Sequence, residues 1–251
     1  MIDLHVHILP GVDDGPKEWD KSLKMLQRAA QDGIRGLVAT PHVMPGVYDN
    51  PMERVLALTE ELKERGKSLP VDIYAGSELT VSHETLAGLE GKRYCTINGT
   101  RYVLLELPGH FSLDTVLDFI FSVTSGGKVP IIAHPERNPR IQADINILYE
   151  LTRLGALLQI TSGSLTGLFG GAVRKLTQDI VSRRLAHLIA SDAHNNGNRA
   201  PLLSDGVKEA AKIIGGRAAS TMVNDLPEKI LNNQIFHVPE PVYPKKKFFF
   251  F

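Results

Sequence analysis

Nine side chains that can bind metal ions carry most of the chemical information in this sequence. They are imidazoles and carboxylates, and they occur in short motifs that lie far apart along the chain. The candidates are His5, His7, Asp14, His42, Glu78, Glu106, His134, Asp192 and His194. Such nitrogen and oxygen ligands suit zinc, manganese or iron. Because one ion needs three or four protein ligands, this set predicts two or three ions.

The spacing within two motifs indicates paired metal ligands. Residues two apart in a strand point to the same face, so His5 and His7 form one pair, and Asp192 and His194 form another. Glu106 lies in an apolar run, where an unpaired carboxylate is costly to bury. Metal ions about 3.5–4 Å apart commonly catalyse phosphoryl displacement through an activated hydroxide. The remaining histidines are interpreted as ordinary surface or core residues: His83, His110, His187 and His237.

A competing phosphatase signature occurs at Cys95 and Arg101, which have the Cys-x5-Arg spacing of cysteine-dependent tyrosine phosphatases. Those enzymes need a loop that runs from a strand into a helix, so that backbone N–H groups cradle the phosphate. Here residues 94–107 read as two strands joined by Asn98-Gly99, a favoured hairpin turn, and no helix is expected after Arg101. The sequence therefore favours metal-dependent chemistry over a thiol nucleophile.

Short apolar runs alternate with helical patterns and predict the elements that position these side chains. The expected strands are 2–7, 34–40, 71–78, two within 94–107, 129–134, 156–161 and 186–191, and the expected helices include 16–33, 51–66, 113–127, 145–155 and 171–184. Near-continuous apolar strands between helices indicate a parallel sheet that is covered on both faces. We predict an α/β fold, a single-domain, distorted (β/α) TIM-like barrel of about seven strands, rather than an open doubly wound sheet. The candidate ligands follow predicted strands, so they should meet at the mouth of the barrel.

Composition limits the possible partners and location. The 251 residues have a formal net charge of zero, which argues against nucleic-acid binding. A single cysteine, no visible secretory signal and no membrane-length apolar run predict a cytoplasmic protein. We expect one domain over residues 1–237 and a Pro-rich, basic and aromatic tail over 238–251. The sequence PKKKFFFF at its end could contact an anionic membrane surface weakly, or it could be a disordered terminus.

The motifs together resemble a known family over essentially the whole chain. They are MIDLHVHILPGVDDG, VATPHVMPGVY, AGSELT, AHPERN, QITSGSLTGLFG and ASDAHN. This combination resembles the PHP (polymerase and histidinol phosphatase) superfamily and, within it, the bacterial protein-tyrosine phosphatases of capsule and exopolysaccharide loci. The resemblance implies a PHP-type barrel with a trinuclear metal centre that manganese often supports, with iron, zinc or magnesium as possible substitutes.

The resemblance also assigns roles to individual positions. The resemblance assigns His5, His7, Glu78 and Asp192 to the first ion, with Glu78 bridging to the second. It assigns Glu106 and His134 to the second ion. The third ion is assigned His42, His194 and one early aspartate. That aspartate is expected to be Asp14, and Asp13 is expected to have no ligand role. Arg137 and Arg199 match arginines that contact the substrate phosphate, which suits the guanidinium fork.

The implied substrate is a tyrosine-phosphorylated protein, namely the tail of a membrane-associated bacterial tyrosine kinase. Such a partner would place the protein in the cytoplasm, peripherally at the inner face of the membrane. The principal alternative is hydrolysis of histidinol phosphate or another small phosphomonoester. Nucleic-acid proofreading and a non-catalytic, metal-stabilised binding module are further alternatives.

Overall fold

Nine parallel strands form two sheets in the computed structural model, which describes residues 1–242. The smaller sheet has the order β1-β2-β4, with β1 at Ile2–Val6, β2 at Gly36–Ala39 and β4 at Asp72–Ala75. The larger sheet has the order β3-β5-β6-β7-β8-β9, with bounds His42–Val43, Glu78–Thr80, Tyr102–Glu106, Val129–Ala133, Leu157–Thr161 and Leu188–Ala190. Every strand pairing is parallel, as the alternation of apolar runs and helices predicts.

The two sheets adjoin each other on both sides. β2 and β3 are successive pieces of one run, as are β4 and β5, and the Gly76 N–H donates to the Ala39 carbonyl at 2.8 Å between them. On the other side, Val6 forms a parallel bridge with Ala193, and the His7 N–H donates to the Ala193 carbonyl at 2.8 Å. Counting each interrupted run once gives seven strand positions, with β1 between β2 and β9. The predicted α/β fold with about seven strands is confirmed.

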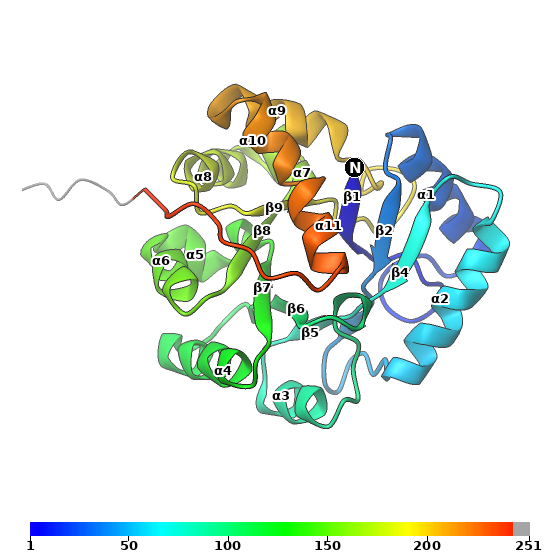
Figure 1. Ribbon diagram of the computed structural model, residues 1–251, viewed down its shortest axis with the longest axis horizontal. Coiled ribbons are helices and arrows are strands. Elements are labelled where there is room, and N and C mark those ends of the chain that lie inside the picture. Colours follow the sequence, from blue (N-terminus) through cyan, green and yellow to red (C-terminus); the bar gives the residue numbers. More distant parts are fainter. Residues whose placement is uncertain (243–251) are drawn as a thin grey trace, which may run out of the picture.

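Helices surround the strands (Figure 1). They are α1 (Trp19–Gln31), α2 (Met52–Gly66), α3 (His83–Glu90), α4 (Leu113–Ser125), α5 (Pro139–Ala143), α6 (Asn146–Arg153), α7 (Ser162–Thr166), α8 (Gly171–Ser182), α9 (Ser204–Ile214), α10 (Gly216–Thr221) and α11 (Asp225–Leu231). Helix α1 buries Met25, Leu26 and Ala29, a spacing that puts an apolar stripe against the strands. An outer core fills the space between strands and helices.

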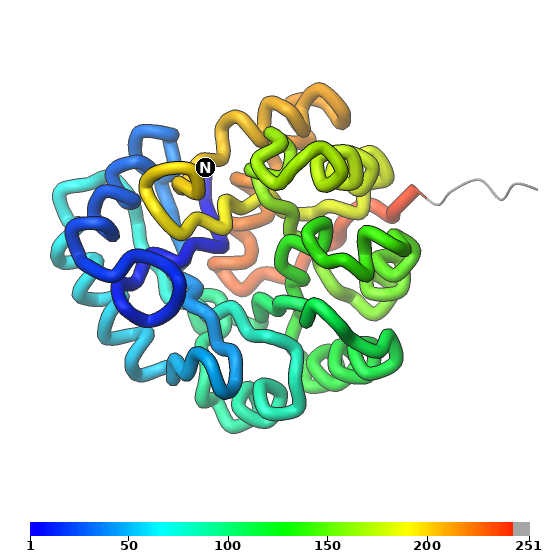
Figure 2. Tube along the Cα trace, turned by 180° about the vertical axis from the view of Figure 1, so that it is seen from behind, coloured from blue at the N-terminus to red at the C-terminus, as the bar shows by residue number. Residues whose placement is uncertain are grey.

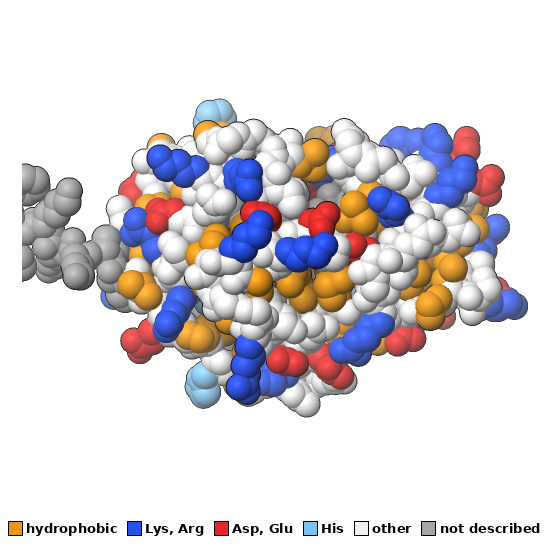
Figure 3. Space-filling view, turned by 90° about the horizontal axis from the view of Figure 1, so that it is seen from above, with side chains coloured by type: hydrophobic (Ala, Val, Ile, Leu, Met, Phe, Trp, Pro, Cys, Tyr) orange, Lys and Arg blue, Asp and Glu red, His pale blue; other side chains and the backbone are white. Residues whose placement is uncertain are grey.

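The surface is charged but mixed in sign. In Figure 3, Lys and Arg side chains lie among Asp and Glu side chains on the face seen from above. This distribution agrees with the formal net charge of zero. Among residues 1–242, no helix combines the length and apolarity that a membrane span requires.

A second apolar cluster fills the inside of the strand assembly toward the N-terminal ends of the strands. Its buried members include Ile2, Leu4, Val38, Tyr102, Leu104, Ile131, Leu157 and Leu188. Ile230 and Leu231 of α11 belong to the same cluster, and Figure 1 shows α11 across the end where β1 begins. One end of the assembly is therefore sealed by apolar side chains, which leaves the opposite end for polar groups.

The predicted hairpin over 94–107 is wrong. Residues Ile97–Gly99 form a short 3-10 helix, η1, and only the second predicted strand exists, as β6. Both edges of β6 are occupied by parallel partners, β5 and β7, so no edge remains for an antiparallel neighbour. Asn98 still has a positive φ, of 49°, but its side-chain amide donates to the Leu231 carbonyl at 3.1 Å and so ties η1 to α11.

The chain after α11 runs across the sealed end of the strand assembly, as the red segment in Figure 1 shows. The Val242 N–H donates to the Arg183 carbonyl at 2.7 Å, and the Tyr149 hydroxyl donates to the Val242 carbonyl at 2.8 Å. The region assigned from the sequence to a tail beginning at residue 238 thus contacts the folded domain as far as Val242. The PKKKFFFF sequence, residues 244–251, lies outside the described residues.

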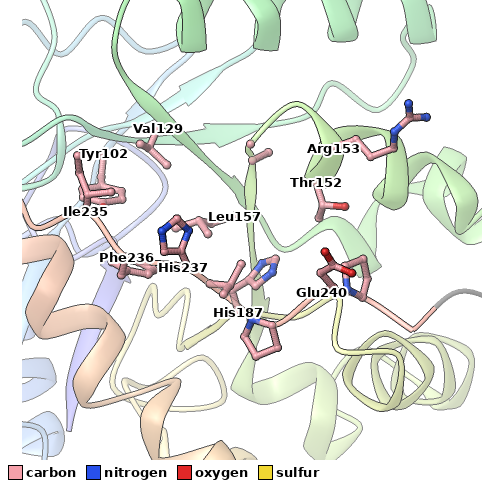
Figure 4. Close-up of a pocket in the computed structure, with 15 residues that line it drawn as sticks. Tyr102, Val129, Thr152, Arg153, Leu157, His187, Ile235, Phe236, His237 and Glu240 are labelled. Atoms are coloured by element: carbon pink, nitrogen blue, oxygen red, sulfur yellow. The ribbon is translucent and has the colours of Figure 1, made fainter.

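A cavity of about 500 Å³ lies between this C-terminal segment and the strand assembly (Figure 4). Tyr102, Leu157 and His187 line it from one side, and residues 235–241 line it from the other. None of the nine candidate metal ligands lines this cavity.

Candidate metal centre

A β-bulge in β1 directs the first two histidines into the barrel. Ile2 and Leu4 face the inner apolar cluster, whereas Val6 packs in the outer core. Between two paired positions, β1 contains one residue more than β2, and this extra residue shifts the alternation of faces. After the bulge, His5 and His7 point inward, and both are fully buried. The expectation that they share a face is met, and the bulge turns this face inward.

Three groups of side chains could each hold a metal ion at the C-terminal ends of the strands. Within each group, one ligand atom per residue lies within 4.8 Å of the others. The groups are His7, Asp14, His42 and His194; His5, His7, Glu78 and Asp192; and His42, Glu78 and Glu106. Adjacent groups share His7, His42 and Glu78, so the three sites are contiguous. Figure 2 shows that the loop after β1, in dark blue, and the loop after β9, in yellow, lie side by side on this face.

His134 completes the set of nine. It follows β7 with a left-handed backbone, φ 30°, which turns the chain sharply into η2 (Pro135–Arg137). Its Nε2 lies 3.0 Å from Glu78 Oε1 and 3.9 Å from Glu106 Oε1. The structure therefore brings all nine predicted side chains together, although His5 and His194 are 189 positions apart in the sequence. Their role as metal ligands stays a prediction.

Buried polar atoms at the middle of the cluster lack the partners they need. Glu78 Oε2 lies 3.2 Å from both His5 Nε2 and His7 Nε2 and 3.0 Å from His42 Nδ1. Yet Glu78 Oε2 and His42 Nδ1 make no hydrogen bond to any described residue. Unpaired buried polar atoms cost free energy, and convergent imidazole and carboxylate donors are the ligands that divalent transition metals prefer. These residues fit a metal ion.

The charge states of the cluster favour metal binding. Burial lowers the pKa of His42 to about 4 and also lowers the pKa of His194, so both rings are neutral and can donate lone pairs. Burial opposes ionisation of Glu78 and Asp192, but the surrounding imidazoles hold both carboxyl pKa values well below their usual range. Burial also disfavours the charged form of His7, but Asp13 raises its pKa, so metal binding should release a proton there.

Asp13, which the sequence analysis expected to have no ligand role, lies outside the three groups but supports a candidate ligand. Its Oδ2 accepts from His7 Nδ1 at 2.7 Å and from the His42 N–H at 3.1 Å. Its Oδ1 accepts from the Gly15 N–H at 2.9 Å. A carboxylate on Nδ1 keeps the proton there and leaves Nε2 free to face a metal. Asp14 instead reaches the cluster itself, with Oδ1 3.1 Å from His194 Nε2, which supports the choice of Asp14 as the ligand.

Gln159 contacts Nδ1 of His5 as Asp13 contacts Nδ1 of His7, and this role was not predicted from the sequence. Its side-chain oxygen lies 2.8 Å from His5 Nδ1, and its side-chain nitrogen donates to the Ile160 carbonyl at 2.9 Å. Gln159 is fully buried in β8. The available signal was a single amide inside the apolar run ALLQIT, since a buried polar side chain needs a partner.

Both predicted phosphate-binding arginines lie beside the cluster. Arg137 donates to Asp192 Oδ2, and Arg199 donates to the same oxygen at 2.7 Å. The Arg137 guanidinium also lies over the Phe169 ring, 4.5 Å from its centroid. The two side chains retain 28% and 24% exposure, so they remain accessible to an anion at the mouth of the site.

Cys95 is not arranged as a nucleophile. It is buried, and burial raises the pKa of its thiol to about 11. The chain continues into η1 and then into strand β6, so no helix N-terminus follows Arg101. A thiolate nucleophile needs a lowered pKa and an anion cradle, and this segment provides neither.

The α/β fold and the clustered imidazoles and carboxylates define an α/β enzyme with candidate metal sites. The comparison with protein families is more specific: residues 1–232 match the family described as capsular polysaccharide synthesis, CpsB/CapC. The chain belongs to this family. The resemblance predicted from the motifs is thereby confirmed.

Two curated relatives are similar over nearly their whole length. The chain is 35% identical to the tyrosine-protein phosphatase YwqE of Bacillus subtilis, with 100% of both chains covered. It is 31% identical to the tyrosine-protein phosphatase CpsB of Streptococcus pneumoniae, with 94% of this chain and 100% of the relative covered.

Solved structures agree with the fold. One match comes from the crystal structures of YwqE from Bacillus subtilis and CpsB from Streptococcus pneumoniae, which are described as metal-dependent tyrosine phosphatases. Its TM-score is 0.92 at 33% identity, and the match covers 98% of this chain and 100% of that one. Histidinol phosphate phosphatase from Lactococcus lactis matches with a TM-score of 0.57 at 13% identity, covering 86% of this chain and 93% of that one. The second match shows a shared fold alone.

Proposed function

We propose that this protein is a metal-dependent protein-tyrosine phosphatase that hydrolyses phosphotyrosine in a protein involved in capsule or exopolysaccharide synthesis. The observation that carries the proposal is the contiguous cluster of nine imidazoles and carboxylates flanked by two arginines. Full-length similarity to YwqE and CpsB supports the same reaction.

The cluster and the arginines divide the work of phosphate-ester hydrolysis. Metal ions bound at the nine side chains would activate water for attack on phosphorus and offset the phosphate charge. Arg137 and Arg199 would turn from Asp192 to the equatorial oxygens of the phosphate, where negative charge grows in the transition state. The phenol of tyrosine has a pKa of about 10, so it leaves more readily than an alkoxide and needs less protonation.

We propose manganese as the resident metal, with iron, zinc or magnesium as possible substitutes, in two or three ions. The proposed ligands are those of the three groups together with His134. The donor set is nitrogen and oxygen only, which suits these metals and disfavours soft ions such as Cu(I). Calorimetric titration of the chelator-treated protein with each metal would give the number of sites and their affinities independently of turnover.

We propose the phosphorylated tail of a bacterial tyrosine kinase as the substrate, and the inner face of the membrane as the place of the reaction. The CpsB/CapC family membership supports a role in capsule synthesis. Weak membrane contact would come from residues 244–251, which lie outside the described residues. Liposome co-sedimentation tests the contact: binding that is unchanged after residues 244–251 are deleted would exclude it.

The reaction itself is tested by comparing a phosphotyrosine peptide with histidinol phosphate, each with and without added manganese. We expect manganese-dependent turnover that is faster on the peptide. The Glu78→Gln variant should abolish this turnover, which shows that it belongs to the cluster and not to a contaminating phosphatase. Faster hydrolysis of histidinol phosphate would overturn the proposed function in favour of the small-molecule alternative.

A further inference from the structure

A groove leads away from the metal cluster between the loops that follow β6 and β7. Its inner part is a hollow of about 160 Å³ lined by Glu106, His134, Arg137 and residues of both loops. Its outer part is an open hollow of about 640 Å³ lined by residues 109–111 and residues 139–140. Gly109 and Pro139 line both hollows, so the two adjoin, and together they form the groove between the cluster and the surface.

The walls of this groove are fixed to each other by Asn138. Its side-chain nitrogen donates to the Pro108 carbonyl at 2.8 Å and to the Leu107 carbonyl at 3.3 Å, which joins the two loops. Its side-chain oxygen caps α5 by accepting from the Arg140 N–H at 3.0 Å. Asn138 is buried, so the groove is a built feature of the fold that exists before any substrate binds.

Arg140 presents an uncommitted cation at the outer end of the groove. It is exposed, and its guanidinium lies over the Phe111 ring, 5.2 Å from the centroid. This stacking restrains the side chain without neutralising it. Arg137 and Arg199 pair with Asp192, whereas the Arg140 guanidinium forms no ion pair with any carboxylate among residues 1–242.

We propose that this groove binds the polypeptide next to the phosphotyrosine, and that Arg140 selects substrates with an acidic residue on that side. The inference rests on the proposed phosphatase function and adds a specificity determinant to it. A phosphotyrosine held at Arg137 would leave its flanking chain in the groove, because the groove begins at that residue. A carboxylate in the flanking chain would meet the Arg140 guanidinium, whose planar fork binds carboxylates with two hydrogen bonds.

The expected size of the preference follows from the exposure of Arg140. An exposed ion pair changes an equilibrium by at most about fivefold, so a Glu flank should raise kcat/KM about three- to fivefold over a Lys flank. Reversing the charge at Arg140 replaces attraction by repulsion, and inversion of a three- to fivefold preference should shift the ratio about 10- to 25-fold toward the Lys flank. High salt should reduce both effects, because exposed charges are screened.

The test compares four phosphotyrosine peptides that carry Glu or Lys on either the N-terminal or the C-terminal side. They are assayed with the wild-type protein, Arg140→Glu, Arg140→Lys and the control Arg217→Glu. Arg217 is also exposed and lines a different hollow, beside α10, and its replacement by Glu produces the same change in net charge as Arg140→Glu. Hydrolysis of p-nitrophenyl phosphate, which has no flanking chain, shows whether each variant keeps a folded active site.

We expect a Glu preference on one side only, its inversion in Arg140→Glu, partial retention in Arg140→Lys, and unchanged turnover of p-nitrophenyl phosphate. Equal kcat/KM values for Glu and Lys flanks in the wild-type protein would overturn the inference. An equal shift in Arg217→Glu would also overturn it, since the effect would then be long-range charge. Absence of turnover on every phosphotyrosine substrate would instead refute the proposed function itself.

Discussion

Replacement of Asp13 by Asn tests whether a carboxylate that does not itself face the cluster controls metal affinity. Every hydrogen bond to the Asp13 carboxylate comes from a donor: His7 Nδ1 and the His42 N–H at Oδ2, and the Gly15 N–H at Oδ1. In the Asp13→Asn variant, the side-chain amide nitrogen would therefore face an N–H group, whether it took the position of Oδ1 or that of Oδ2. At the Oδ2 position it could also donate to His7 Nδ1 and move the ring proton to Nε2, the atom that faces the metal.

The magnitude follows from comparable carboxylate–histidine–metal arrangements, in which loss of the outer partner costs about 10- to 100-fold in metal affinity. We expect Asp13→Asn to fall within this range because it affects His7, which two of the three groups share. Asp14→Asn should weaken mainly the group that contains His194, since Asp14 lies outside the other two groups.

The assay is calorimetric titration of the chelator-treated protein with manganese, together with the manganese concentration that half-restores turnover. Asp205→Asn is a matched control, because Asp205 is exposed on α9 and pairs with Lys208 at 2.8 Å. The reasoning would be refuted if Asp13→Asn bound manganese as tightly as the control. It would also be refuted if saturating manganese failed to restore turnover, because the carboxylate would then act in the reaction and not through metal affinity.

Three further changes probe other parts of the structure. His187→Gln should flatten the pH dependence of stability. Burial depresses the pKa of His187 from 6.5 to about 4, so the wild-type protein loses stability as the pH falls from 6.5 toward 4. Measured by urea unfolding, its free energy of unfolding should fall by about 3 kcal/mol relative to that of the variant. An unchanged difference between the two proteins at pH 7 and pH 4 would contradict this. Cys95→Ser should keep turnover within about twofold of the wild-type value, since the segment around Cys95 provides no anion cradle for a thiol nucleophile. Abolished turnover would support the thiol mechanism instead. Arg199→Ala should lower kcat/KM for a phosphotyrosine peptide about 100-fold, and an unchanged value would remove Arg199 from the site.

The sequence predicts well that the candidate ligands lie together, because their convergence follows from topology. Once the strands are parallel, the ends of all strands that carry these residues meet on one face, whatever the angles of the individual strands. His134 and Asp192 illustrate this, since His134 directly follows β7, Asp192 lies two positions after the end of β9, and each has a positive φ that turns the chain at the mouth. The prediction required strand identity but no knowledge of side-chain contacts.

The roles of Asp13 and Gln159 could not be predicted from the spacing of residues along the sequence. Asp13 meets His42 only because the loop after β1 folds back over the start of β3. Gln159 meets His5 only because both face the interior from distant strands, and His5 does so through a bulge. The failed hairpin at Asn98-Gly99 has the opposite origin: a strong local turn signal was overridden because β6 already had two parallel neighbours.

The division of the interior into an apolar end and a polar end explains why the bulge in β1 matters. A regular strand that kept Ile2 and Leu4 in the inner apolar cluster would have turned His5 and His7 outward into the outer core. A regular strand that aimed both histidines inward would have removed Ile2 and Leu4 from the cluster that α11 covers. One extra residue allows the same short strand to contribute to both. The first strand can therefore close the apolar end of the assembly and supply two side chains of the candidate metal centre within the first seven residues of the chain.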